Sequence, residues 1–526
     1  MSLIDLKNVF DKIICDFIDP SGRSELCDRL VEAVRTWNSS AKFTIGEVSD
    51  YEQPSKSKDV ECQTANEISS VSLPLQRLKL KPDEQQLLTQ LRNGTAIHRN
   101  LEKICGPAKA VEIRRQHLEE TENLSFEKLP YRDFDYVNAA GQCIENSIGY
   151  TTLPVGYVGP LNLNNERVHS LFATTEGALV ASVNRGCKAV SKNGVKTSII
   201  DVGMTRAPVF EFVNVLDAQE CIEWIEANYV AIKSVFEGTS RFCKLKSIVP
   251  VLDKFLYLRF RAFTGDAMGM NMITKAVQAA VEFIEKQFQG RIKLLSLSGN
   301  LCCDKKAAAI NWDTGRGKVV KAEAVVPASV VKSVLKTDVH AMAKLADAKL
   351  MIGSKLAGTI GGSNAQAANV VAAMFIACGQ DAAQVVSSSM CSTKIEATEE
   401  GDLYISCTMN CLEVGTVGGG TILEAQKTAL KILQCDGPNI ETPGANANRF
   451  AQIVCATVLA GELSLLAAQC TDDLVRSHMV YNRSSRSLET VASCPTTLNE
   501  SSRLKSRHPN ALPRELGGIP CAGVFH

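Results

Sequence analysis

The sequence lacks the features that mark several classes of protein. Its 57 Lys and Arg residues are balanced by 57 Asp and Glu residues, so it does not have the basic character of a domain built to bind nucleic acid. We see no apolar run close to the ~20 residues of a membrane span. The most apolar windows, 369–378 and 453–460, are followed closely by Asp381 and Glu462. Acidic residues also interrupt the apolar pattern at the start, so a signal peptide is not expected.

Cysteine motifs for metal or redox chemistry are missing as well. The 19 cysteines are scattered over the chain, and none forms a C-x-x-C pair. This argues against zinc and thioredoxin-like sites, so we expect no metal. Many loose thiols in a long chain indicate a reducing compartment. The sequence therefore predicts a soluble, globular protein of the cytoplasm.

The patterns along the 526 residues predict several domains and a mixed α/β fold class. Strands alternate with helices in one segment, which predicts a small inserted domain of ferredoxin-like type within a larger, helix-rich domain. We expect an N-terminal extension and linker at 1–81, a helical region at 82–144, the large domain at 145–207 and 297–480, the small domain at 208–296, and a flexible tail at 481–526.

Helical periodicity places the longer helices of the large domain. The predicted ranges are Thr175–Lys188, Ala328–Lys344, Asn364–Gln384 and Ala447–Gln469. The last of these is the most apolar.

No standard G-x-G-x-x-G dinucleotide fingerprint is present. Three other Gly-rich turns occur, at 265–272, 358–366 and 415–421. Glycines at the start of a helix let a phosphate approach backbone N–H groups closely. One such turn is more often only a turn, but three in one chain favour a nucleotide-like ligand.

A few titratable residues lie among small or apolar neighbours. Glu176 lies near the start of a predicted helix, where a carboxylate is favoured in any case. Asp381 is predicted within an apolar helix, where burial requires a cationic partner, and Lys305 is the obvious candidate. Lys305 belongs to the charged triplet 304–306, which alone would suggest solvated surface. His478 follows a long helix, although an isolated histidine usually has no special role.

Nine motifs occur together and in order: ATTEGALVASVNRGC, DVGMTR, GDAMGMNM, SGNLCCDKKAAAINW, AGTIGGSNAQAAN, ACGQDAAQ, DLYISCTM, GTVGGGT and SHMVYNRSS. With them the chain closely resembles the class I, eukaryotic-type 3-hydroxy-3-methylglutaryl-coenzyme A reductases, from about residue 82 to 483. The resemblance implies NADPH-dependent, four-electron reduction of the thioester to mevalonate and free coenzyme A, with two NADPH per turnover. This reaction commits carbon to isoprenoid and sterol synthesis.

The resemblance also assigns four catalytic roles. Lys305 would stabilise the oxyanion formed by hydride attack. His478 would protonate the departing coenzyme A thiolate. Glu176 would donate a proton in the aldehyde step, so burial or a nearby carboxylate must keep it protonated. Asp381 would hydrogen-bond to both Lys305 and Glu176.

Further residues match ligand-binding positions of the family. The substrate positions are Arg206, which suits a free carboxylate, with Ser298, Asn300, Asp304, Lys306, Lys349 and Asn369. The coenzyme A positions are Ser182, Asn184, Arg185 and Lys336. The NADPH positions are Ser240 and Arg241 near the 2′-phosphate, then Asp266, Met268, Gly269, Met270, Asn271, Thr416, Val417, Gly418, Gly419 and Gly420.

The sequence departs from the family at two places. Gln366 stands where animal members often have histidine, which implies altered loop contacts rather than loss of activity. Near 96–101 the family usually has a tyrosine over the adenine ring, where this chain offers only Ile97 or His98. Class I members also usually carry an N-terminal membrane domain. We expect no membrane span in this chain, which would then lie on the cytosolic face of the endoplasmic reticulum if such a domain was removed.

The resemblance implies partners too. Family members form homodimers or homotetramers with the active site between subunits, and residues 145–161 resemble their dimer-contact segment. Ser484 matches a serine whose phosphorylation inhibits the family, although Val480 and Tyr481 stand where the kinase usually finds a basic residue.

Two alternatives remain open. One is a different NAD(P)-dependent oxidoreductase. The other is a non-catalytic relative, which the presence of all four catalytic residues makes less attractive.

Overall fold

The computed structural model describes residues 82–471. The chain divides into Met1–Leu78 and Lys79–His526, and every described residue belongs to the second unit. The predicted extension at 1–81, the tail at 481–526, His478 and Ser484 lie outside the described residues. Residues 82–471 form helices and antiparallel sheets, so the expected mixed α/β class is confirmed.

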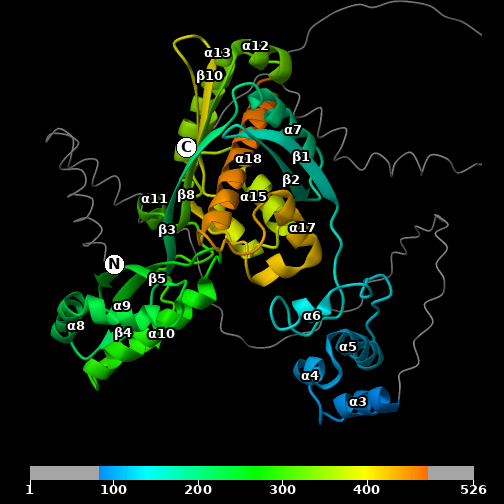
Figure 1. The fold of residues 1–526 in the computed structure, drawn as a ribbon, viewed down its shortest axis with the longest axis vertical. Helices are drawn as coiled ribbons and strands as arrows, with labels where there is room; N and C mark the ends of the chain where they lie inside the picture. The colour runs from blue at the N-terminus through cyan, green and yellow to red at the C-terminus, as the bar shows by residue number, and fades with distance from the viewer. Residues whose placement is uncertain (1–81, 472–526) are drawn as a thin grey trace, which may run out of the picture. The chain divides into compact units, whose positions relative to one another are not determined.

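Short helices open the described chain (Figure 1). They are α3 (Pro82–Arg92), η1 (His98–Asn100), α4 (Leu101–Cys105), α5 (Pro107–Thr121) and α6 (Tyr136–Ala139). Left-handed glycines such as Gly106 (φ 82°) break the periodic pattern into these pieces. The Arg114 side chain is buried and donates to the Ser147 carbonyl at 2.5 Å and to the Glu102 carboxylate at 2.7 Å. This buried cation therefore ties α4 and α5 to the segment that follows them.

One antiparallel sheet of eight strands runs through the fold, in the order β7-β4-β6-β3-β8-β10-β9, with β5 paired to β6. A separate hairpin pairs two further strands. The strands are β1 (Val155–Leu163), β2 (Glu166–Ala173), β3 (Lys196–Arg206), β4 (Val209–Phe212), β5 (Lys244–Leu252), β6 (Leu256–Phe263), β7 (Ile292–Ser296), β8 (Gly317–Val326), β9 (Ser392–Ala397) and β10 (Leu403–Leu412). Residues 204–206 of β3 pair with 260–262 of β6, which makes the sheet continuous between the two predicted domains.

A separate hydrophobic core is built mostly from the segment expected to form the small domain, together with Met204 of β3. Its helices are α8 (Val215–Ala227), α9 (Tyr229–Glu237) and α10 (Met270–Gln287). The side chain of Asn214 caps α8 by accepting from the backbone N–H groups of Leu216 and Asp217. The apolar face of α10 includes Ile273, Val277 and Ile284, all fully buried. Helical periodicity in the sequence thus matches the observed core.

The larger core surrounds helix α18 (Ala445–Cys470), which packs on β8, β10, α7 (Leu179–Val190) and α15 (Ala367–Ala377) (Figure 1). By length and composition α18 could cross a membrane, so the expectation that no apolar stretch reaches that size was wrong. However, 89% of its most apolar window is buried inside the fold. The apolar character of α18 is that of a core helix, since strands and helices cover it on several sides.

Several predicted helices of the large domain are shorter than expected. Helix α7 starts at Leu179, after Ala178 in the left-handed region. Helix α15 ends at Ala377, and left-handed Gly379 starts a turn. The remaining helices are α11 (Ala309–Thr314), α12 (Ala328–Val330), η2 (Val331–Leu335), α13 (Val339–Ala346), η3 (Asp347–Gly353), α14 (Ser354–Ala357), η4 (Ala382–Gln384), α16 (Val385–Ser388), η5 (Gly419–Ile422) and α17 (Glu424–Ile432).

Candidate active site

The predicted pair of Lys305 and Asp381 is present. The Lys305 Nζ lies 2.8 Å from Asp381 Oδ2, and both side chains remain partly exposed. Asp381 is not inside a helix, as we expected. It lies just before η4, and its Oδ1 accepts from the backbone N–H of Ala383 at 3.0 Å. The hydrogen bond from Lys305 to Asp381 raises the pKa of Lys305, so the ammonium stays charged well above neutral pH.

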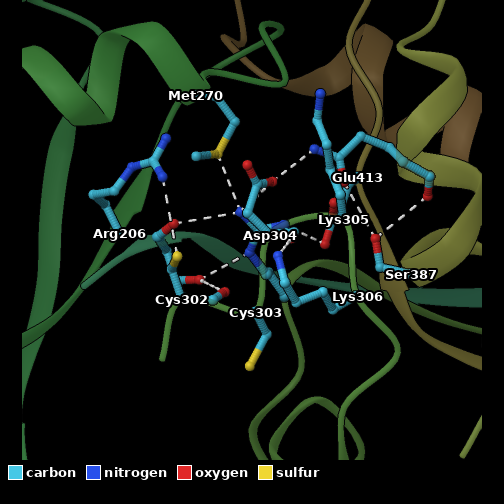
Figure 2. Close-up of polar contacts among 12 residues, drawn as sticks. Arg206, Met270, Cys302, Cys303, Asp304, Lys305, Lys306, Ser387 and Glu413 are labelled. Atoms are coloured by element: carbon cyan, nitrogen blue, oxygen red, sulfur yellow. Dashed lines mark hydrogen bonds and ion pairs between the residues drawn. The ribbon is translucent and has the colours of Figure 1, made fainter. Parts of the chain in front are cut away.

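Asp304, the neighbour of Lys305, is held by two other side chains. Its Oδ1 accepts from Gln384 Nε2 at 2.8 Å and lies 3.1 Å from Arg316 Nη2. Burial acts to raise the pKa of Asp304, but the Gln384 hydrogen bond and the Arg316 charge hold it below its usual range. Figure 2 shows Asp304 at the centre of these contacts, between Arg206 and Glu413. Asp304 is therefore an anchored carboxylate rather than a solvated one.

Glu176 has a different partner from the one predicted. Its carboxylate accepts from Asn369 Nδ2 at 3.0 Å, and among the described residues no bond joins it to Asp381. Glu176 is exposed and lies three residues before α7, so the burial expected to keep it protonated is not present in the described part of the chain. These four candidate site residues therefore form two bonded pairs, Lys305 with Asp381 and Glu176 with Asn369.

Arg206 lies at the end of β3, where its Nε donates to Thr274 Oγ1 at 3.0 Å. Its Nη1 lies 4.0 Å from Cys302 Sγ, which is also 3.5 Å from Ser298 Oγ (Figure 2). Burial acts to raise the pKa of Cys302, but the hydrogen bond with Ser298 and nearby positive charge lower it overall. This brings two predicted substrate residues, Arg206 and Ser298, around one thiol.

The other predicted substrate residues are more scattered. Asn300 and Lys306 are exposed on the same loop, and Lys306 Nζ donates to the Asp304 carbonyl at 3.0 Å. Lys349 lies in the π-helix η3, partly buried. No group of three or more His, Cys, Asp or Glu side chains suited to a metal occurs within residues 82–471.

Three of the predicted coenzyme A residues are bonded within the protein. Ser182 and Arg185 on α7 both bond to Ser464 on α18, with Arg185 Nη2 donating to its carbonyl at 2.7 Å. Asn184 accepts from the Gly159 N–H and donates to the Tyr157 carbonyl. These bonds join α7 to α18 and to β1. The fourth residue, Lys336, is exposed in a left-handed conformation at the end of η2.

Two of the three Gly-rich turns lie side by side. Ala267 and Val417 form a parallel bridge, and the Thr416 N–H donates to the Asp266 carbonyl at 2.8 Å. Gly415 packs so closely that a Cβ there would lie 2.3 Å from the Met268 nitrogen. Gly269 precedes α10 without a side-chain cap, which leaves N–H groups at the start of a long helix. The predicted positions 266–271 and 416–420 therefore share one surface.

Two predicted cofactor residues have particular surroundings. Asp266 is buried, and its carboxylate accepts from the N–H groups of Asn439 and Ala447, so it anchors the start of α18. Arg241 is exposed and lies over the Phe242 ring, 4.6 Å from the ring centre, while Ser240 Oγ accepts from the Phe242 N–H. Among the residues that the structure describes, no carboxylate forms an ion pair with Arg241.

Sequence reasoning missed the side chains that support this site. Gln380 accepts from the Gly415 N–H at 2.9 Å and donates to its carbonyl at 2.8 Å, which connects the Asp381 turn to a Gly-rich loop. Arg316, Glu413 and Gln384 were also missed. The sequence does carry a signal for Glu413. It is a charged residue within the apolar run 411–414, and a buried charge of this kind needs a partner.

Gln366, the departure from the family, is part of a compact set of bonds. Its Nε2 donates to the Gly461 carbonyl at 2.7 Å, and its backbone N–H donates to Glu462. Glu462 is buried in α18 and also accepts from Ala365 N–H and Thr393 Oγ1. The glutamine thus supports the start of α15, the helix that carries Asn369. At the other departure, Ile97 is 54% exposed.

Comparison with known proteins gives a direct family match. A family model described as hydroxymethylglutaryl-coenzyme A reductase matches residues 110–483. The chain belongs to this reductase family. The resemblance stated from the motifs is therefore confirmed, and the matched range contains both groups of candidate catalytic residues as well as His478.

Individual relatives extend this result. Proteins named 3-hydroxy-3-methylglutaryl-coenzyme A reductase from Blattella germanica and Drosophila melanogaster are 49% and 50% identical over 420 and 416 residues. These matches cover 78% and 76% of this chain but 49% and 45% of the relatives, so the chain spans about half their length. Reductase 1 of Dictyostelium discoideum is 47% identical over 76% of this chain and 73% of its own length.

A solved structure shares the fold. The class II reductase from Streptococcus pneumoniae, bound to NADPH, aligns with a TM-score of 0.51 and 16% identity. The alignment covers 73% of this chain and 96% of that one.

Proposed function

We propose that this chain catalyses the NADPH-dependent, four-electron reduction of 3-hydroxy-3-methylglutaryl-CoA to mevalonate and free coenzyme A. Membership of the reductase family supports the assignment, and the 2.8 Å pair of Lys305 and Asp381 is the observation that carries it. A charged ammonium on a surface still partly open to ligand can stabilise the oxyanion that hydride addition to a carbonyl creates.

Lys305 acts on the carbonyl oxygen in both steps, because each hydride addition creates negative charge there. Asp381 keeps Lys305 charged and oriented. His478 protonates the coenzyme A thiolate, and Glu176 donates the proton to the oxygen of the aldehyde intermediate. Asn369 orients Glu176 through its 3.0 Å hydrogen bond. Arg206 pairs with the free carboxylate of the substrate, as a guanidinium suits this task.

The two adjacent Gly-rich loops fit NADPH. Their close packing and the uncapped start of α10 offer backbone N–H groups to a phosphate. When bound, the cofactor supplies the hydrides. Met268, Gly269, Asn271 and residues 416–420 would line its site, with Arg241 and Ser240 at the 2′-phosphate. Asp266 and Met270 then act indirectly, by shaping the loop. Ser182, Asn184 and Arg185 of α7 already form hydrogen bonds within the protein. To bind coenzyme A, they must bond to it in addition to these partners or in place of them.

The active site is completed between two subunits in this proposal. Within residues 82–471 no hydrogen bond or ion pair joins Glu176 or Asn369 to Lys305 or Asp381, which leaves room for a second subunit to bring further groups to the site. Exposed apolar residues on the expected contact segment, such as Val155 and Tyr157, agree with a homodimer or a homotetramer.

The domain plan is also a proposal. The strand order β7-β4-β6-β5, with helices between β4 and β5 and between β6 and β7, supports a ferredoxin-like unit at 208–296 inserted between 145–207 and 297–480. The helical region 82–144 precedes them.

We place the catalytic domain in the cytoplasm. Phosphorylation of Ser484 would inhibit it by adding negative charge near a site for anionic ligands, and turnover of a semisynthetic phosphoserine form tests this.

The deciding experiment follows NADPH oxidation by the purified chain on addition of 3-hydroxy-3-methylglutaryl-CoA. Other acyl-CoA thioesters, hydroxy acids and NADH are the controls. Oxidation that depends on this thioester supports the proposal. Reaction with a hydroxy acid instead would favour a different oxidoreductase, and no reaction with any of them, in a folded dimer, would favour a non-catalytic relative.

A further inference from the structure

The loop that carries Lys305 is held in an unfavourable backbone conformation. Asn300, Cys303 and Lys305 have φ of 64°, 57° and 59°, a left-handed region that residues with a Cβ seldom occupy. Such a conformation persists only where the surroundings fix it. Contacts with the rest of the fold must therefore hold this loop in place.

Backbone anchors hold the first part of the loop. The Gly299 N–H donates to the Ala207 carbonyl at 2.7 Å, and Thr205 Oγ1 donates to the Cys302 carbonyl at 2.8 Å. Nearer to Lys305 the anchor is the carboxylate of Asp304, which bonds to Arg316 and Gln384. Asp304 is thus the last fixed side chain before the reactive lysine.

Arg316 is a fully buried cation that joins four parts of the fold. Its Nη1 lies 2.5 Å from Glu413 Oε1, and Glu413 is fully buried as well. Its Nε donates to Thr205 Oγ1 at 2.8 Å, and its Nη2 contacts Met270 Sδ at 3.1 Å as well as Asp304. Although burial acts to lower the pKa of Arg316, the two carboxylates raise it above the usual range. The guanidinium is permanently charged.

Gln384 connects the same carboxylate to the other half of the reactive pair. It lies in η4, the turn that begins directly after Asp381. Two neighbouring links therefore join the Lys305 loop to this turn, Lys305 with Asp381 and Asp304 with Gln384, each at 2.8 Å. If Asp304 is fixed by Arg316, the lysine and its carboxylate partner are fixed relative to each other.

We propose that Arg316 and Glu413 are positioning residues for the reduction. They hold the Asp304 carboxylate in place and thereby fix the orientation of the Lys305 side chain. The inference rests on the proposed function of this site. Removing two buried ions and replacing them with apolar side chains is often neutral or stabilising, so a role in folding alone does not require this pair. Neither residue touches the reacting atoms in this account.

The test replaces both ions, as Arg316→Met with Glu413→Leu, so that neither member of the fully buried pair is left without the other. The matched control is Lys318→Met with Asp201→Leu, which removes another ion pair at 2.5 Å, less deeply buried and formed between β8 and β3. Thermal melting and binding of NADPH are measured for each variant. Gln384→Met provides a second test that leaves the ion pair intact.

We expect kcat of the Arg316/Glu413 variant to fall by about tenfold to a hundredfold, as for other small misplacements of a reactive group. Melting temperature and NADPH affinity should stay near those of the control. The basic limb of the pH profile should also move to lower pH, since Lys305 would be less firmly held against Asp381. Gln384→Met should lower kcat in the same direction.

Amide exchange of the 299–306 segment gives a readout without activity, and it should be faster in both variants. A wild-type chain inactive on the thioester would defeat the proposed function alone, because exchange still reports whether Arg316 holds the loop. The positioning role is wrong if the folded double variant keeps kcat within twofold of the control with unchanged exchange. If the double variant does not fold, unchanged kcat and exchange in Gln384→Met overturn it.

Discussion

Gly186 allows α7 and α18 to cross at very short distance, and replacing it with alanine should damage the fold. A Cβ at this position would lie 1.9 Å from the carbonyl oxygen of Ala460 and 2.6 Å from its carbonyl carbon. Ordinary contact begins at 3.4 Å, so the backbone of α18 would have to move by about 1.5 Å. Since α18 is the central core helix, it cannot move without opening the core around it.

We expect Gly186→Ala to lower the free energy of unfolding by about 3 kcal/mol, the upper end for overpacking, because the obstacle is backbone rather than a movable side chain. The bonds from Ser182 and Arg185 to Ser464 would be stretched too. The control is Gly361→Ala, where no atom lies within 4 Å of the added Cβ and no positive φ is required. That change should stay within about 0.5 kcal/mol of wild type.

Urea unfolding followed by circular dichroism measures both variants in the same buffer. Equal stability of Gly186→Ala and Gly361→Ala would refute the reasoning, because it would mean that α7 and α18 can separate freely. A loss confined to Gly186→Ala would support the close crossing.

Four further predictions concern the chemistry. Lys305→Ala should reduce turnover by at least about 10²–10³, the usual loss of an oxyanion donor, and activity within tenfold of wild type would contradict its role. His478→Gln should impair reduction of the thioester but spare reduction of added mevaldehyde, which releases no thiolate; equal loss in both assays would point to a structural role. Asp381 raises the pKa of Lys305, so wild-type activity should decline only as pH rises through that raised value. Asp381→Asn should move this decline to lower pH, and an unmoved limb in the pH profile would separate Asp381 from Lys305. Arg241→Ala should raise KM for NADPH without changing the weak use of NADH, and equal effects on both cofactors would show that another cation contacts the 2′-phosphate.

Local sequence patterns predicted elements whose determinants are local. The helix 445–470 follows from periodicity, which predicts it at 447–469. Helix ends were less predictable, because left-handed Ala178 and Gly379 set them. A left-handed alanine has no sequence signal, since its conformation is imposed by packing.

The candidate site was predictable where motifs name residues, and not where packing connects them. The Lys305–Asp381 pair was foreseen from the need to balance a charge. The partner of Glu176 was not, because Asn369 comes from a helix 193 positions away in the chain. Arg316 and Glu413 were missed for the same reason: each looks like an isolated charge until the fold places them 2.5 Å apart.

The ratio of NADPH oxidised to coenzyme A released tests the central claim most directly. Thiol release and absorbance at the NADPH wavelength are followed together with limiting 3-hydroxy-3-methylglutaryl-CoA, and the product is identified by mass. The account predicts two NADPH consumed for each thiol released, with mevalonate as product and no turnover by Lys305→Ala. A ratio of one, or oxidation of NADPH without release of thiol, would contradict four-electron reduction at this site.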